Sequence, residues 1–571
     1  GIVTDKWPMP YSLPVGMAST FFGLIVLGNA HSFAFLVLGA CLIGFGSAVF
    51  LAAEVSESAA WRASMALAAV ALLSACSGSM APLSAPVAEH ATASLKGVAL
   101  LNRITWGVTP GLLAQASRDG DTFLDRQLRP ALPVTLPTLV RVQIESLGIV
   151  QTPTWQMVAT VEQQRRDLDG IKDVDQKKLA QTAYQGELNR VVREAQTRSL
   201  LRAMYSPAQL QEQMTWFWMN HFNVHMFKAN VRILVGDYEE VAIRPYALGR
   251  FRDLLGATVR HPAMIRYLDN EQNAVGKLKE NYARELMELH TLGVGSGYTQ
   301  TDVQQLARIL TGVGVNFGNA RPKLKPEHEV QYVRDGGFEF NPNRHDFGDK
   351  QFLGLVVKGR GLAEVDEALD RLARHPATAR FISHKLALFF VSDAPPPALI
   401  ERMAASFLHS DGDIASVLKT LFRSPEFAAS SGSKFKDPMH FVVSAVRLAY
   451  DDQPILNATP LIGWLNRMAQ PLYGRQTPDG YPMTSDAWAS PGQMTTRFEI
   501  AKAIGSGNAG LFKTDPAAAP SAVVLPQMAT LMRNAELQTI ISPLTREALE
   551  QAKTPQEWNT FLIASPDFMN R

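Results

Sequence analysis

Apolar and polar positions form blocks along this chain, and the first blocks differ from the rest. Residues 11–28 and 32–53 are uncharged and largely apolar, and each run is near the ~20 residues with which a helix crosses a bilayer. A shorter apolar run, residues 65–73, cannot span a membrane stably. The pattern predicts two transmembrane helices followed by a targeting segment.

From about residue 96 onward, the apolar positions follow the spacing of amphipathic helices. We expect a first helix over residues 98–105, a second with Thr109 as its cap, and a long polar helical stretch over 158–204. Strand signals are concentrated in residues 313–360, whose glycine, aromatic and β-branched content predicts a hairpin or an irregular ordered loop. Further helices are expected over residues 207–222, 280–292, 301–312, 363–372, 376–390, 397–408 and 412–422. The fold class is therefore mainly α, a large multi-helix body with one small irregular or β region.

The short apolar run has the organisation of a bacterial lipoprotein signal. Arg62 supplies the positive start, and the small residues Ser74 and Ala75 let a peptidase approach the bond before Cys76. Cys76 is then expected to be lipidated and to begin an exported protein. The alternative is a buried helix that ends at a free cysteine, but the run is alanine-rich and has no polar face.

This interpretation divides the chain into four parts. Residues 1–54 carry the transmembrane helices, residues 55–76 form the signal segment, residues 77–95 form a Ser/Ala/Pro-rich tether, and residues 96–571 form the helical domain. The expected location is the periplasmic face of the bacterial cell envelope. Ser77, directly after the lipidated cysteine, resembles the sorting signal for the outer membrane.

Charge and cysteine content exclude several function classes. The 55 lysines and arginines nearly balance the 53 aspartates and glutamates, which argues against nucleic-acid binding through a strong basic field. Cys41 and Cys76 are the two cysteines, so the exported part has neither an internal disulfide nor a cysteine nucleophile. A serine hydrolase is disfavoured because the sequence lacks the Gly-x-Ser-x-Gly motif.

Two stretches carry candidate chemistry. On a continuous helix His221 and His225 would share a face and both reach one divalent metal ion; alternatively, they donate hydrogen bonds beneath an aromatic core. Glu285 and Glu288 lie one helical turn apart with Arg284 beside them. Such carboxylates can share a proton, bind a metal with a histidine, or act as acid and base. The alternative is an Arg284–Glu288 ion pair that fixes the helix register.

Of the other polar motifs, some are expected to be structural, and for one the sequence allows either a binding or a packing role. Thr299 or Thr301 can cap the helix that Asp302 opens, and His375 is expected to cap a helix as well. The loop over residues 480–492 is rich in proline, glycine and aromatic residues. It can line a groove for sugars or peptides, or it can be a packed loop.

The beginning of the chain resembles a known transporter family. The runs at residues 4–17 and 42–50 resemble the fosmidomycin-resistance branch of the major facilitator superfamily, and the resemblance stops after Phe50. Two helices cannot build the cavity between repeats that such transporters need. We interpret residues 1–54 as a truncated transporter fragment joined to another gene, which is not expected to transport.

The remainder resembles the bacterial domain-of-unknown-function 1800 family over about residues 96–571. The motifs that carry the resemblance are Asn102-Arg103, residues 106–110, residues 216–225, residues 281–293, residues 310–312, His345-Asp346 and residues 374–379. The resemblance implies a bacterial, usually exported protein. It implies no activity, because none is established for the family.

Two function classes follow. The first is a non-catalytic envelope lipoprotein that binds or helps assemble an exported polysaccharide or a partner protein. The second is an envelope hydrolase or metal-dependent enzyme that uses Glu285 and Glu288, with His221 or His225 as a ligand. We favour binding, because the sequence contains no complete catalytic motif.

Overall fold

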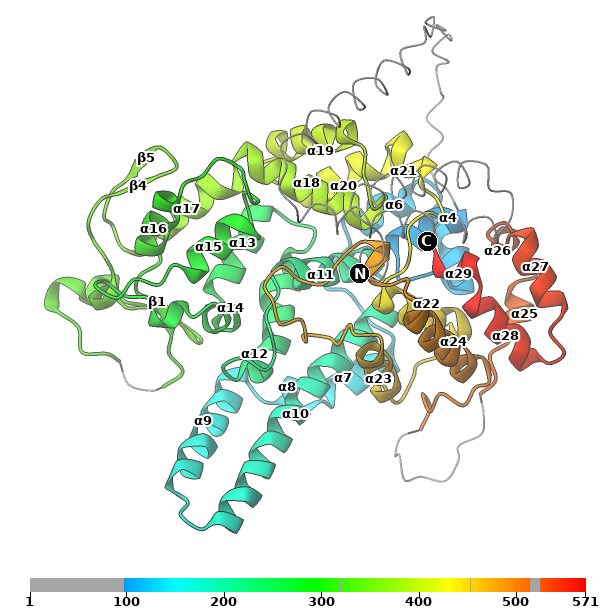
Figure 1. The fold of residues 1–571 in the computed structure, drawn as a ribbon, viewed down its shortest axis with the longest axis horizontal. Coiled ribbons are helices and arrows are strands. Elements are labelled where there is room, and N and C mark those ends of the chain that lie inside the picture. Colours follow the sequence, from blue (N-terminus) through cyan, green and yellow to red (C-terminus); the bar gives the residue numbers. More distant parts are fainter. Residues whose placement is uncertain (1–96, 319–320, 452, 514–523) are drawn as a thin grey trace, which may run out of the picture. The chain divides into compact units, whose positions relative to one another are not determined.

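A computed structural model describes residues 97–318, 321–451, 453–513 and 524–571 of the chain (Figure 1). The expected transmembrane helices, the signal segment with Cys76 and the tether lie outside the described residues. Within the described part, no helix is long and apolar enough to cross a membrane. The fold described here is that of one compact unit, His90–Arg571.

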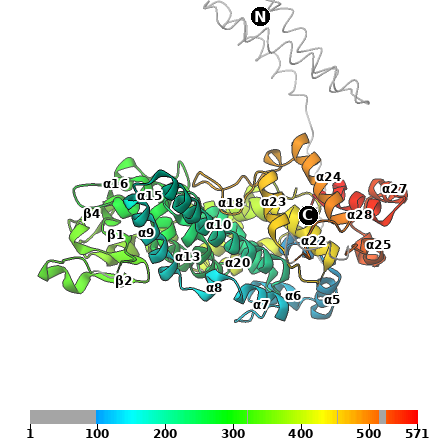
Figure 2. The same ribbon diagram turned by 90° about the horizontal axis from the view of Figure 1, so that it is seen from below.

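The unit is mainly helical, as the sequence predicts (Figures 1 and 2). The helices that precede the strands are α4 (Gly97–Ile104), α5 (Pro110–Asp119), α6 (Thr122–Leu128), α7 (Thr138–Glu145), α8 (Gly148–Gln151), α9 (Thr154–Gly170), α10 (Val174–Tyr205), α11 (Gln209–His221), α12 (Val231–Asp237), α13 (Phe251–Arg260), α14 (Pro262–Tyr267), α15 (Asn281–Glu288) and α16 (Gln300–Ile309). The helices that follow them are α17 (Leu362–Ala373), α18 (Pro376–Phe390), α19 (Pro397–His409), α20 (Ile414–Phe422), α21 (Pro425–Ala429), α22 (Pro438–Tyr450), α23 (Thr459–Arg467), α24 (Pro491–Gly505), α25 (Met528–Leu531), α26 (Ala535–Gln538), α27 (Pro543–Glu550), α28 (Pro555–Ala564) and α29 (Pro566–Met569).

The strands of the described part all lie within the predicted region 313–360. They are β1 (Val313–Val315), β2 (Val333–Asp335), β3 (Phe338–Phe340), β4 (Lys350–Phe352) and β5 (Leu355–Val357). The first three form an antiparallel sheet in the order β1-β3-β2, and β4 and β5 form a hairpin. Phe340 and Phe352 are fully buried and belong to the same hydrophobic core as the helices.

Capping residues determine where several helices begin. The Thr109 side chain accepts a hydrogen bond from the first turn of α5. Thr299 and Asp302 form a reciprocal capping box at α16, and the ring of His375 accepts a backbone N–H at the start of α18. Each satisfies an N–H that the helix leaves unpaired. These three predictions are confirmed.

The long polar stretch is two helices rather than one. Helix α9 ends at Gly170, and α10 begins after Asp173, whose carboxylate accepts the backbone N–H of Gln176. Glycine weakens a helix interior and aspartate offers a new cap, so the chain turns here. Figure 1 shows α9 and α10 side by side.

A repeated helix–cap–proline–helix unit shapes the middle of the chain. The sequence Arg-His-Pro-Ala occurs at residues 260–263, between α13 and α14, and again at residues 374–377, between α17 and α18. In both copies the histidine backbone is extended, and its Nδ1 accepts the N–H two residues later. The unit therefore fixes the orientation of His261 and His375.

A buried arginine joins the first described helix to distant segments. Arg103 in α4 is fully buried. Its guanidinium donates to the main-chain oxygens of Phe390, Val391, Ser430 and Arg571. These carbonyl acceptors satisfy a charge that would be costly to bury alone. This residue of the Asn-Arg motif is structural.

Candidate functional site

The two predicted metal-binding histidines do not lie on one helix. Helix α11 ends at His221, because Phe222 leaves helical geometry with φ −99° and ψ 51°. His225 follows in irregular backbone, so the premise of a shared helix face is wrong. No group of three or more His, Cys, Asp or Glu side chains in the described part could hold a metal ion. The divalent metal stays a prediction without a described ligand set.

His221 instead pairs with His290. The His221 Nε2 lies 3.0 Å from the main-chain oxygen of His290, to which it donates, and the ring centroids are 6.0 Å apart. Burial and the nearby Lys385 charge lower the pKa of both rings, that of His290 to about 3. Both histidines are therefore neutral. Nδ1 of His221 and Nε2 of His290 have no hydrogen-bond partner among the described residues.

The two predicted carboxylates have different environments. Arg284 lies 3.4 Å from Glu288 and 3.2 Å from Glu280, which confirms the ion-pair alternative for Glu288. Glu285 has no ion pair within the described part. Burial, followed by the charge of Glu288, raises the pKa of Glu285. Of the two carboxyls, Glu285 is thus the one whose environment favours a proton.

A lysine that the sequence did not single out as chemical lies near this region. Lys385 of α18 is half-buried, and its ammonium lies 5.5 Å from the centre of the Phe381 ring. Burial lowers the pKa of Lys385 to about 8, opposed by the charge of Asp479. Asp479 also acts on Glu285. Lys385, Asp479 and Glu285 therefore belong to one electrostatic neighbourhood, assembled from α15, α18 and the loop before α24.

The His345-Asp346 motif is part of the core. His345 Nε2 lies 3.0 Å from Glu364, and the Lys350 ammonium also contacts Glu364, with all three side chains fully buried. Asp346 is paired with Arg308 at 2.8 Å. The Lys350–Glu364 contact ties the β4–β5 hairpin to α17, and the Asp346–Arg308 pair ties the motif to α16. The motif is structural.

The loop over residues 480–492 is packed against α11. The Asn220 side chain donates to the Tyr481 oxygen at 3.0 Å and accepts the Tyr481 N–H at 2.6 Å. Gly480 has φ +80°, and a Cβ there would lie 2.2 Å from the Asn220 main-chain oxygen. The close approach requires glycine.

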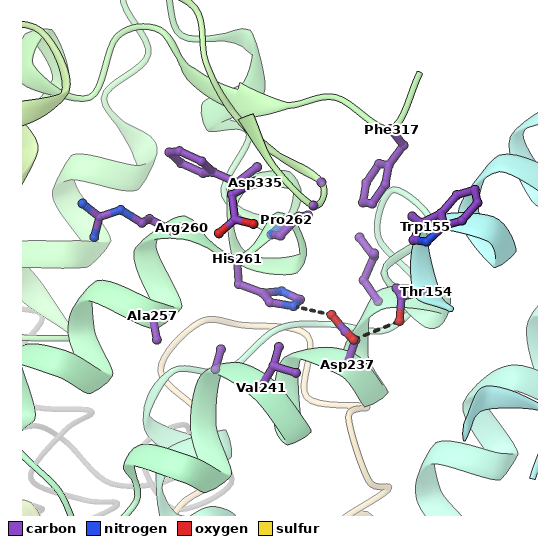
Figure 3. Close-up of a pocket in the computed structure, with 15 residues that line it drawn as sticks. Thr154, Trp155, Asp237, Val241, Ala257, Arg260, His261, Pro262, Phe317 and Asp335 are labelled. Carbon is purple, nitrogen blue, oxygen red and sulfur yellow. Dashed lines mark hydrogen bonds and ion pairs between the residues drawn. The ribbon is translucent and has the colours of Figure 1, made fainter. Parts of the chain in front are cut away.

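A pocket of about 460 Å³ lies elsewhere in the unit (Figure 3). Its walls come from the start of α9, from α12 and the π-helical segment that follows it, from the α13–α14 junction, and from residues around the β1–β3–β2 sheet. The π-helical segment, η1 (Tyr238–Ile243), continues directly from α12. Such segments often occur at functional sites.

The polar floor of the pocket is fixed by hydrogen bonds (Figure 3). Asp237 accepts from Thr154 Oγ1 at 2.9 Å and from His261 Nε2 at 3.0 Å. His261 Nδ1 accepts the N–H of Ala263 at 3.1 Å, so the ring hydrogen is on Nε2. Burial alone would raise the pKa of Asp237, but the hydrogen bonds bring it below its ordinary value. Asp237 is ionised, and His261 has no free nitrogen lone pair.

Aromatic and charged side chains complete the walls. Trp155 is 58% exposed and lies on the same side of the pocket as Phe317 in Figure 3, with Arg260 on the opposite side. Arg260 is held by Asp366 at 2.6 Å. The pocket thus presents flat apolar surfaces together with fixed charges, as ligand sites commonly do.

Sequence reasoning missed this pocket. Its residues come from segments that are up to about 180 positions apart, and no local pattern brings them together. One signal was present, because the Arg-His-Pro-Ala sequence at residues 260–263 is repeated at 374–377. A histidine held in a repeated capping unit has a fixed orientation, and only the first copy faces the pocket.

The comparisons with known proteins follow the same division of the chain. The profile described as "Protein of unknown function (DUF1800)" matches residues 99–570. The chain belongs to the DUF1800 family. This match covers the whole described helical body except its edges, and it confirms the resemblance of its motifs.

The N-terminal 50 residues of this DUF1800 protein are similar to transporters. They are 54% identical to the fosmidomycin resistance protein of Escherichia coli K12 and 44% identical to an uncharacterized MFS-type transporter of Bacillus subtilis 168. Each similarity covers 9% of this chain and 12% of the relative, so the chain spans about an eighth of their length. No solved structure matches the chain.

Proposed function

We propose that this DUF1800 protein is a non-catalytic envelope lipoprotein that binds an exported polysaccharide in the Asp237–His261 pocket. The observation that carries the proposal is that both ring nitrogens of His261 are engaged, one by Asp237 and one by a backbone N–H. An Asp–His pair acts as a general base only when a ring nitrogen is free to accept a proton. The His261 ring is therefore placed for recognition and not as a general base.

The lining supports a sugar as the ligand. Trp155 and Phe317 provide flat apolar faces for the C–H side of a sugar ring. Asp237 and Arg260 offer charged hydrogen-bonding groups for hydroxyls, and charged partners strengthen such bonds. Because each of these two side chains is already held by a neighbour, little conformational entropy is lost on binding.

The expected anchor suits a polymer on the outside of the cell. A lipid on Cys76 would attach the protein to the membrane, and the tether at residues 77–95 would let the helical body reach material in the envelope. We propose that residues 1–54 take no part in this function.

Binding is testable with defined sugars. Soluble hexasaccharides of cellulose, chitin and mannuronate would be titrated into the purified protein by calorimetry. We expect at least one to bind, and Trp155→Ala to weaken it by about five- to tenfold, as loss of an aromatic platform costs ~1–1.4 kcal/mol. Asp237→Asn should weaken it as well, through lost charge-assisted hydrogen bonds.

Phe227→Ala is the matched control, because Phe227 is also 58% exposed and does not line the pocket. It should bind as the wild type does. Equal losses in Trp155→Ala and Phe227→Ala, or no binding of any hexasaccharide, would contradict the proposal.

The enzymatic alternative has one supporting observation, the raised pKa of Glu285 beside Glu288. A carboxyl whose pKa is raised can serve as the acid of an acid and base pair. Chromatography of the same protein–hexasaccharide mixtures distinguishes binding from hydrolysis, because hydrolysis would produce shorter sugars. We expect the hexasaccharides to be recovered intact.

A further inference from the structure

Two buried lysines near the start of α22 have opposite surroundings. Lys434 is 3% exposed, and its ammonium reaches Asp393 at 2.5 Å and the Met483 oxygen at 2.7 Å. Lys436 is 4% exposed, and its ammonium has no ion pair or hydrogen bond to any residue that the structure describes. It lies 3.7 Å from the centre of the Phe568 ring.

Two further positively charged side chains, Arg497 and Arg571, lie near Lys436. Burial, followed by the charges of the buried Arg571 and Arg497, holds the pKa of Lys436 well below its ordinary range. The Asp437 carboxylate lies 3.0 Å from His440 and offsets part of the charge of Arg497 and Arg571. A buried charge without a partner is costly, so this region is electrostatically complementary to an anion.

Lys436 also lines a cavity. The cavity, of about 40 Å³, lies among α4, α22 and the helices from α25 to α29. One water needs about 10–15 Å³ measured in this way, so the space is sufficient for a carboxylate group. Asp567 is the acidic residue of the lining, and its Oδ2 already accepts from the backbone N–H and the hydroxyl of Ser542.

The remaining lining is mostly apolar. Its apolar side chains include Leu448, Met532, Leu537, Ile540, Ile541 and Leu562, and its polar members are Asn102, Ser444, Ser565 and Asn570. Ile540 is 37% exposed, which leaves an apolar surface at the mouth of the cavity. An inorganic anion would gain nothing from these side chains, whereas a hydrocarbon chain would bury surface against them.

We propose that this cavity binds a monocarboxylate with an apolar tail. The carboxylate contacts the Lys436 ammonium, and the tail covers Ile540 and Ile541. The site lies on different elements from the Asp237–His261 pocket, and nothing in it depends on the proposed polysaccharide function.

Octanoate and octanol separate the contribution of the charge from that of the tail. Titrated into the purified full-length protein by calorimetry, octanoate should bind at least tenfold more tightly than octanol, and acetate and inorganic phosphate should bind more weakly than octanoate. Octanol binding as tightly as octanoate, or phosphate binding more tightly, would overturn the proposal. This comparison uses the wild-type protein and so requires no variant to fold.

Lys436→Met removes the charge and keeps the length of the side chain. It should lower octanoate affinity at least tenfold and leave octanol binding unchanged. Lys502→Met, an exposed lysine on neighbouring α24, is the matched control and should bind both ligands as the wild type does. Unaltered octanoate binding by Lys436→Met would overturn the assignment of the carboxylate to Lys436.

Discussion

At the residue scale, buried ionisable groups in this protein differ by whether they have a partner. Glu364 contacts both His345 and Lys350 in a fully buried network. Within the described part of the chain, Lys385 has no ion pair; its ammonium faces the ring of Phe381, and the charge of Asp479 acts on it. A pair offsets the cost of burying its charges, whereas a buried charge without such a partner is retained at a cost in stability. Lys385 is therefore a residue where stability and function are expected to conflict.

Lys385→Met should stabilise the protein by about 1–2 kcal/mol at pH 7, because it removes a charge that burial disfavours. Thermal unfolding measures the change. Lys502→Met, which alters an exposed lysine, should leave the melting temperature unchanged. A lower melting temperature for Lys385→Met would show that the ammonium has a stabilising partner.

The same lysine predicts a pH dependence. Its pKa is about 8 in the folded protein, against an ordinary value of 10.5. Between these values the unfolded chain binds more protons, so wild-type stability rises with pH. Below pH 8 the lysine is protonated in both the folded and the unfolded state, so the full free-energy cost of burying its charge is present. The stability difference between Lys385→Met and the wild type should therefore shrink from pH 8 to pH 10.5, and a constant difference would contradict this account.

At the element scale, the sequence predicts most helices because their starts are local. Thr109, Thr299 and His375 each cap the helix that follows them, and capping depends on residues within one turn. Helix ends were harder to predict. The break after Gly170 has a local cause in the Asp173 cap that follows, whereas the end of α11 at His221 depends on how the chain packs. The end at His221 removed the premise of the metal site.

The packing of one loop against α11 can be tested through Gly480. Gly480→Ala should destabilise the protein by about 2–3 kcal/mol, because alanine disfavours φ +80° and its Cβ would overlap the Asn220 oxygen. Denaturant unfolding measures the loss. Gly276→Ala is the matched control, since Gly276 has φ +77° and no atom within 4 Å of an added Cβ. Equal losses in the two variants would mean that the loop does not pack closely.

At the scale of the whole unit, contacts between distant segments determine what the sequence could not predict. The pocket joins Thr154, Asp237, His261 and the turn after Asp335, and none of these is near another in the sequence. The motifs that carry the family resemblance do not line the Asp237–His261 pocket. Several of their polar residues, such as Arg103 and His345, hold distant segments together instead.

Arg103 permits a test at this scale. Arg103→Lys keeps the charge but cannot donate to four main-chain oxygens at once. We expect a loss of about 2–4 kcal/mol in the free energy of unfolding, because buried acceptors lose their donors. Arg118→Lys, at an exposed position of α5, should cost little. A loss as small as that of Arg118→Lys would contradict the proposed structural role.

The π-helical turn η1 has a consequence for how this pocket can diversify. A π turn differs from an α-helix by one extra residue, so removing one residue between Tyr238 and Ile243 would restore the ordinary helix. Everything on one side of that point would rotate by about 100° relative to the other. Relatives that differ by a single insertion or deletion here would therefore turn a different face of this segment, and a different side chain, toward the pocket.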